Sequence, residues 1–159
     1  MSRESSLQLR IAAVDKSKIK CVAVIQCAVA HERCPGAKCA AAFSGRKHYF
    51  VGYGPGTIYY VPFGCGGCPG RRVGRLATYL KRAFKKHQSV EPEEIAVHLA
   101  TCIVGDNAHY PPCPFRQDIK LMLSRKGLKV VEGSVYSKSL EAKREAGVYA
   151  KLPPIENVS

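Results

Sequence analysis

The tetrapeptide Cys65-Gly66-Gly67-Cys68 has the spacing best suited to chemistry in this chain. Two thiols separated by two residues can ligate one metal ion together, or they can close a small redox disulfide. Glycines allow the backbone to curl so that both sulfur atoms point the same way, and they let amide N–H groups approach a thiolate. Taken alone, the motif leaves metal binding and thiol redox chemistry open.

Other cysteines decide between these two chemistries. The chain has 8 cysteines in 159 residues, and most of them fall in or beside segments rich in Gly, Pro or Ala. Cys21 differs because it lies inside an apolar run, and we expect it only to pack there. A thioredoxin-like site needs only its pair, so the other loop cysteines favour metal ligation. The candidate metal ligands are Cys27, Cys34, Cys39, Cys65, Cys68, Cys102, His109 and Cys113.

The nature of the metal stays open between zinc and an iron–sulfur cluster. The loop cysteines outnumber the four ligands of one tetrahedral ion, which allows two sites, one site with reactive thiols, or a cluster with spare cysteines. Cys34, Cys68 and Cys113 each precede proline. That pattern recurs among iron–sulfur ligands, although proline also ends local structure.

Three further residue types could take part in chemistry. His109 lies between Cys102 and Cys113 and could ligate metal or act as an acid or base near neutral pH, so His109 and Cys102 are the candidate catalytic residues. Arg71 and Arg72 follow the Cys-x-x-Cys pair at the expected start of a helix, where positive charge is unfavourable without a nearby anion. A thiolate-rich metal site or a small anionic ligand would supply that anion.

The chain is strongly basic, with a formal net charge of +13. Such a charge indicates an anionic partner, and residues 71–87 carry seven basic residues and no acidic one. No nucleic-acid reader motif or aromatic stacking platform accompanies this stretch, so nucleic acid is the weaker partner hypothesis.

The composition is that of an ordinary globular domain, with 46% hydrophobic and 23% charged residues. No apolar run approaches the roughly 20 residues that span a bilayer, and the first residues lack the apolar stretch of a signal peptide. We therefore expect a cytoplasmic protein without a membrane partner, in a compartment where the cysteines stay reduced.

Short runs of branched apolar residues alternate with helical patterns along the chain. This alternation predicts the α/β class: a single three-layer domain with a short, mainly parallel sheet of about four to five strands flanked by helices. We expect an N-terminal extension over 1–18, the domain over 19–136 and a charged surface tail over 137–159. Strands are predicted over 19–27, 57–63, 95–102 and within 128–136, and helices over 34–43, 71–87 and 114–127.

The predicted strands place the thiols together. Cys27, Cys65 and Cys102 each end a predicted strand. Carboxyl ends of parallel strands border the ligand crevice of an open α/β sheet, so three distant segments would deliver their sulfur atoms to one edge. His98 lies within the third predicted strand, and we expect it to be a hydrogen-bonded core histidine.

Five ordered segments resemble the CGGC-domain family from about residue 19 to residue 136. The resemblance implies a metal-binding protein rich in cysteine and histidine, and it implies no particular reaction. The chain departs from the family pattern at Phe115, where relatives often carry histidine, so one potential ligand is missing. The segments are CPGAKC, VPFGCGGCPGRR, VHLATC, HYPPCP and VVEGS.

These observations lead to three functional hypotheses. The first is a cysteine-rich metal-binding protein whose site could serve an enzymatic reaction on a small anion held by Arg71 and Arg72. The second is a thiol-disulfide oxidoreductase that uses the Cys65–Cys68 pair. The third is a basic nucleic-acid-binding module with a structural metal. The sequence leaves the substrate and the oligomeric state open.

Overall fold

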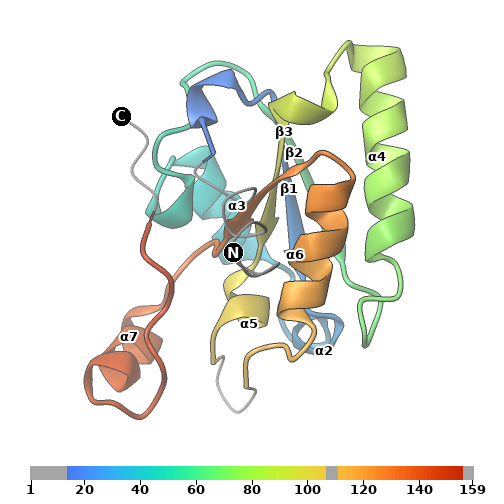
Figure 1. Cartoon of the computed structure of the whole chain (residues 1–159). Helices are drawn as coiled ribbons and strands as arrows, with labels where there is room; N and C mark the ends of the chain where they lie inside the picture. Colours follow the sequence, from blue (N-terminus) through green and yellow to red (C-terminus); the bar gives the residue numbers. More distant parts are fainter. Residues whose placement is uncertain (1–13, 107–110, 156–159) are drawn as a thin grey trace, which may run out of the picture.

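A computed structural model of the chain describes residues 14–106 and 111–155. At its centre lies a sheet of four strands, all parallel, in the order β2-β1-β3-β4, with helices on both faces (Figure 1). This is the α/β architecture that the sequence predicts. The elements in chain order are η1 (Lys16–Lys18), β1 (Cys21–Gln26), α2 (Ala28–His31), α3 (Ala37–Ser44), η2 (His48–Phe50), β2 (Tyr59–Gly64), α4 (Val73–Gln88), η3 (Pro92–Glu94), β3 (Ile95–Leu99), α5 (Thr101–Val104), α6 (Arg116–Arg125), β4 (Lys129–Glu132) and α7 (Lys138–Glu145).

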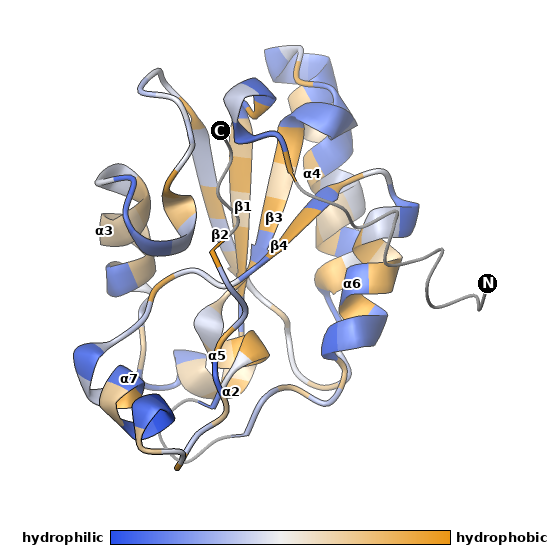
Figure 2. Ribbon diagram, turned by 60° about the vertical axis from the view of Figure 1, so that its left-hand side comes forward, coloured by the Kyte–Doolittle hydropathy of each residue, from blue (hydrophilic) through white to orange (hydrophobic). Residues whose placement is uncertain are grey.

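The strand sequences fit their places in the sheet. β1 and β3 are central, and every residue of both is buried, as their continuous apolar runs require. β2 is an edge strand and contains Pro62, which faces Val24 of β1. Proline lacks an amide N–H, so it is tolerated at an edge where one side of the strand has no partner. Figure 2 shows the hydrophobic residues concentrated on the central strands.

The two faces of the sheet are covered by different helices. α4 and α6 pack on one face, where Leu80 and Leu123 join the larger apolar cluster. α3 and η2 pack on the other face through Phe43 and Phe50. Fully burying a Leu or Phe side chain contributes about 1.5–3 kcal/mol, so these contacts fix both layers. The Nζ atom of Lys126 also donates to Thr78 Oγ1 at 2.7 Å and links α6 to α4.

The strand order reverses direction between β1 and β3. The chain moves outward from β1 to β2, then returns across β1 to form β3 and β4. In open α/β sheets, ligands bind beyond the carboxyl ends of the strands at such a switch point. In this protein α2, α5 and α7 lie on that side of the sheet (Figure 1).

Some predicted bounds are wrong in detail. The strand expected over 95–102 ends at Leu99, because the chain turns there and Ala100 N–H donates to Ile25 O at 2.9 Å. Cys102 consequently lies on the short helix α5. The helix expected to begin at residue 71 begins at Val73, with Arg72 as its N-cap.

The segment after β4 packs against the domain through specific contacts. Arg144 of α7 is only 3% exposed, and its Nη2 atom donates to Asp106 O at 2.9 Å. Further along, Tyr49 Oη donates to Pro153 O at 2.6 Å. Part of the charged tail expected on the surface is therefore anchored, and α7 lies on the side of the molecule to which the carboxyl ends of the strands point (Figure 1).

His98 is the buried polar side chain at the centre of the α3 face. It is fully buried, its Nε2 atom lies 2.6 Å from Tyr53 Oη, and its Nδ1 atom lies 2.8 Å from Gly133 O. The prediction of a hydrogen-bonded core histidine is confirmed. Burial, with a smaller effect from the charge of Lys16, lowers the pKa of His98 to about 3.

This burial predicts a pH-dependent stability. An unfolded histidine has a pKa near 6.5, so between about pH 6.5 and 3 the unfolded chain binds the extra proton and is favoured as pH falls. We expect His98 to make the free energy of unfolding about 2 kcal/mol smaller at pH 5 than at pH 7, as measured by urea unfolding. The variant His98→Gln should flatten this pH dependence, whereas His87→Gln, at an exposed position, should leave it unchanged. An equal pH dependence in His98→Gln would contradict the assignment.

Candidate functional site

Two cysteines follow neighbouring strands at the carboxyl edge of the sheet. Cys27 comes directly after β1, and Cys65 comes directly after β2. The last register pair joins Gln26 to Gly64, and Cys65 N–H donates to Gln26 O at 2.8 Å. The parallel pairing therefore carries residues 27 and 65 to the same edge, as the sequence predicts.

Successive backbone amides after β1 bind sulfur atoms from two other segments. Cys27 N–H donates to Cys102 Sγ at 3.2 Å, and Ala28 N–H donates to Cys65 Sγ at 3.3 Å. Hydrogen bonds from backbone amides to sulfur favour the thiolate form, which is the form that ligates metal. The turn into α2 thus holds the ends of the β2 and β3 segments on either side of β1.

The CGGC loop joins β2 to α4. Cys65 is buried and Cys68 is exposed. Gly66 and Gly67 both have positive φ angles, of 79° and 103°, which glycine adopts without steric cost. A Cβ atom on Gly66 would lie 2.5 Å from Arg72 Cγ, so the stem of this arginine folds back onto the loop.

Cys113 brings a fourth segment to the CGGC side of the edge. Its N–H donates to Ile103 O at 2.8 Å, and its thiol is partly buried. Burial raises the pKa of Cys113, and the nearby thiols of Cys68, Cys27 and Cys65 raise it further. We call these four residues, Cys27, Cys65, Cys68 and Cys113, the CGGC thiol group.

A second set of thiols lies toward α3. Cys39 is buried, and its Sγ atom lies 3.2 Å from Ser134 Oγ. Burial raises the pKa of Cys102 to about 12, and the nearby thiols of Cys27, Cys39 and Cys34 raise it as well. We call Cys34, Cys39 and Cys102 the α3 thiol group. Cys27 of the CGGC thiol group contacts it, because Cys27 N–H donates to Cys102 Sγ.

The α3 thiol group lines a pocket of about 540 Å³ at the switch point of the sheet. Ser134 lines the pocket and is fully buried, and its Oγ atom accepts from Thr101 N–H at 3.1 Å. Gln26, at the end of β1, lines the pocket too. Sequence reasoning missed Gln26, Thr101 and Ser134, although all three stand at or just after a strand end, which is the signal that could have found them.

The donor chemistry fits a soft metal. Thiolates are the ligands of structural zinc and of iron–sulfur clusters, and both thiol groups lie at the carboxyl edge. Within residues 14–106 and 111–155, however, no three Cys, His, Asp or Glu side chains already stand in a metal-holding group. A bound metal would therefore require the thiols to move closer together, and the amide N–H groups that donate to Cys65 and Cys102 can stay bonded to the sulfur atoms while they do so.

The remaining predicted site residues are distributed as follows. His109, a candidate ligand and candidate catalytic residue, lies outside the described residues. Cys102, the other catalytic candidate, has a raised pKa, which disfavours its thiolate at neutral pH. Arg71 and Arg72 are exposed beside the CGGC loop. Cys21 is fully buried in the apolar cluster, as expected for a packing residue.

A known protein family matches the region that carries this site. The family model described as the CGGC domain matches residues 21–135, which is more than half of the chain. The chain belongs to the CGGC-domain family. The matched region contains both thiol groups and ends at Val135, before α7 begins. Searches of curated proteins and of solved structures gave no match.

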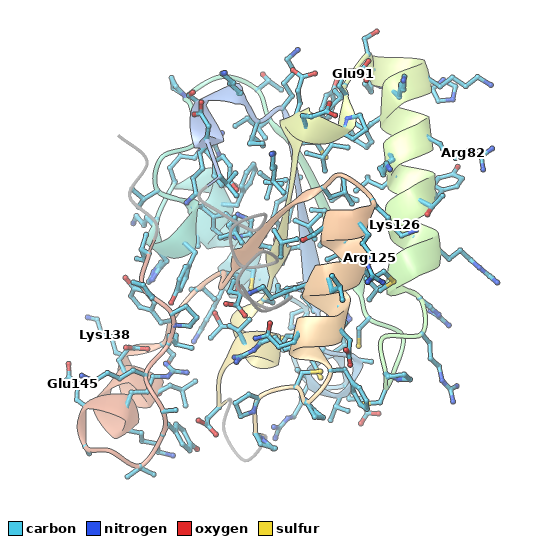
Figure 3. All side chains as sticks on the ribbon, viewed as in Figure 1. Arg82, Glu91, Arg125, Lys126, Lys138 and Glu145 are labelled. Carbon is cyan, nitrogen blue, oxygen red and sulfur yellow. The ribbon has the colours of Figure 1, made fainter. Side chains whose placement is uncertain are left out.

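None of the helices in the described part of this CGGC-domain protein is long and apolar enough to cross a membrane. The longest amphipathic helix, α4, instead buries Val73, Ala77 and Leu80 against the sheet. Four of its basic residues, Arg75, Arg82, Lys85 and Lys86, are exposed, and Figure 3 shows Arg82 pointing away from the sheet.

The close contact at Gly66 yields a test of the loop geometry. We expect Gly66→Ala to lower the free energy of unfolding by about 2 kcal/mol, because alanine is strained at this φ and its Cβ displaces the Arg72 stem. Gly67→Ala is the matched control: it carries similar φ strain, but the nearest atom, Arg71 Cδ, is 4.0 Å away, so about 1 kcal/mol is expected. Urea unfolding of both variants compares them. A larger loss in Gly67→Ala would contradict this geometry.

Proposed function

We propose that this protein binds a soft metal through the CGGC thiol group, with Cys65 and Cys68 as the core ligands and Cys27 and Cys113 completing the set. The observation that carries the proposal is the convergence of three segments at one edge of the sheet. Cys27 and Cys65 follow the paired strands β1 and β2, and Ala28 N–H donates to Cys65 Sγ at 3.3 Å. The thiols of Cys68, Cys27 and Cys65 are near enough to Cys113 to add to the effect of burial on its pKa. Four thiolates are the number that a tetrahedral zinc ion or an iron–sulfur cluster takes. The α3 thiol group and His109 remain candidate ligands of a second site.

Zinc and an iron–sulfur cluster are the two metal centres that this proposal includes. Zinc would supply a structural cross-link or Lewis acidity, and an iron–sulfur cluster would supply electron transfer. The chain's own part is to gather the thiolates: Ala28 N–H positions Cys65 Sγ, and the glycines of the loop allow Cys68 to turn inward. Eight free thiols suit a reducing compartment, which supports a cytoplasmic location.

Arg71 and Arg72 support the proposal through charge. A divalent ion held by four thiolates carries a formal charge near −2, and cations nearby offset it. Among the described residues neither arginine has an acidic partner within ion-pair distance. The two side chains are thus free to offset the site's charge or to hold a small anionic substrate there.

The thiol-disulfide oxidoreductase is the second candidate function. It is favoured by the contrast between exposed Cys68 and buried Cys65 within one Cys-x-x-Cys loop. In this case the Cys68 thiolate would attack a partner disulfide and release one partner thiolate, and Cys65 would then attack the mixed disulfide, releasing the second partner thiolate and closing the Cys65–Cys68 disulfide. The basic outer face of α4 is the feature that supports the nucleic-acid alternative.

Metal analysis tests the first proposal against the second. Protein purified without oxygen should contain about one zinc ion per chain, or iron and sulfide with broad visible absorption. Cys65→Ser and Cys113→Ser should each lose most of this metal, because one ligand is missing. Cys21→Ala is the matched control and should keep it, since Cys21 is buried in the sheet. Metal-free protein with a reversible Cys65–Cys68 disulfide would replace the metal proposal by the oxidoreductase.

A pair of double variants tests the role of the arginines. Replacing Arg71 and Arg72 by Gln should weaken zinc binding about tenfold, because the charge of the thiolate site is no longer offset. Replacing Arg75 and Arg82 by Gln removes the same charge from the outer side of α4 and should leave the affinity unchanged. Competition with a chromogenic chelator measures both. Equal weakening in the two double variants would mean that only the net charge of the protein matters.

A further inference from the structure

The pocket beside α3 is separate from the CGGC thiol group and has the properties of a small-molecule site. Its volume of about 540 Å³ falls within the roughly 300–1,000 Å³ typical of ligand pockets. Its walls come from the end of β1, the stretch from α2 to the start of α3, the start of α5, the turn after β4 and the start of α7. Apolar side chains such as Ala37, Val135 and Leu140 alternate there with hydroxyl groups.

The charge of the pocket selects anions. Arg33, Lys38 and His31 line it, and none of its described lining residues is acidic. Lys38 has no acidic partner within ion-pair distance in the described part of the chain. Basic side chains around a concave surface raise the local concentration of anions and their rate of association.

One thiol of the α3 group is available to react with a molecule in this pocket. Cys39 Sγ is engaged with Ser134 Oγ, and Cys102 Sγ accepts from Cys27 N–H. Cys34 is exposed at the mouth of the pocket, between Arg33 and Lys38 in the sequence. In the described structure its thiol makes no hydrogen bond, so it is the nucleophile that an incoming ligand meets first.

We propose that this pocket binds a low-molecular-weight disulfide that carries carboxylate groups, and that Cys34 exchanges with it. Anionic carboxylates pair with the basic rim, and the disulfide bond lies against the thiol. The Cys34 thiolate attacks one sulfur of the disulfide, a Cys34–sulfur bond forms, and the bond between the two ligand sulfurs breaks. The ligand is the oxidant. Cys34 first gives its proton to water, and the departing half of the ligand leaves as a thiolate and takes a proton back from water. The step uses no residue of the CGGC thiol group, none of which lines the pocket, and does not require a metal.

The test compares two disulfides on the reduced full-length chain. Glutathione disulfide is the anionic probe, and hydroxyethyl disulfide is the neutral probe. Peptide mass spectrometry gives the rate at which each forms an adduct on Cys34. Lys38→Gln should slow the glutathione adduct about fivefold and leave the hydroxyethyl adduct unchanged, because only the first probe carries carboxylates. Lys47→Gln, which removes an exposed lysine that does not line the pocket, should change neither rate.

Steric variants test whether the pocket itself is used. Ala37 is exposed and lines the pocket, whereas Ala41 is exposed on the same helix and does not line it. Ala37→Trp should abolish the preference of Cys34 for glutathione disulfide, and Ala41→Trp should preserve it; thermal unfolding shows that both variants fold.

The proposal is overturned if Lys38→Gln and Lys47→Gln act alike, if the two tryptophan variants act alike, or if glutathione is found mainly on Cys68. Metal content is measured separately in these variants. If the protein bound no metal at the CGGC thiol group, the result on glutathione exchange at Cys34 would still stand.

Discussion

Two consecutive backbone amides at the end of β1 determine how the thiols of this protein are arranged. Cys27 N–H and Ala28 N–H point to sulfur atoms of Cys102 and Cys65, which come from the segments after β3 and β2. β1 can serve both because it is the strand at which the chain order reverses, with β2 on one side and β3 on the other. The separation into two thiol groups on either side of this turn follows from the same arrangement.

The pocket depends on a second set of buried polar contacts that fix the ends of β3 and β4 relative to each other. Ser134 Oγ accepts from Thr101 N–H, and Ser134 N–H donates back to Thr101 Oγ1 at 3.2 Å. His98 reinforces this junction by its hydrogen bond with Gly133 O. Because buried polar groups without partners are costly, these reciprocal bonds leave few alternative conformations for this part of the pocket.

The sequence predicted the parallel sheet and the edge at which the cysteines meet, because both follow from local patterns. Apolar runs of β-branched residues identify strands such as β1, and a Cys directly after a strand must lie at its carboxyl end. The division of the thiols could not be predicted, since it depends on which face of the sheet each connecting helix covers: α3 carries Cys39 to one face, and the segment before α6 carries Cys113 to the other. The anchoring of Arg144 was likewise hidden, because a charged residue in a charged helix gives no signal of burial.

The wall that α7 gives to the pocket lies beyond residue 135, where the match to the CGGC-domain family ends. The thiols and this one wall of the pocket are therefore encoded in separate stretches of the chain. A relative with the same cysteines and a different carboxyl-terminal segment would have the same thiols in a pocket of different shape. It would therefore react with molecules of different shape. Selectivity in such proteins can diverge by exchange of one peripheral segment, without disturbing the sulfur chemistry beneath it.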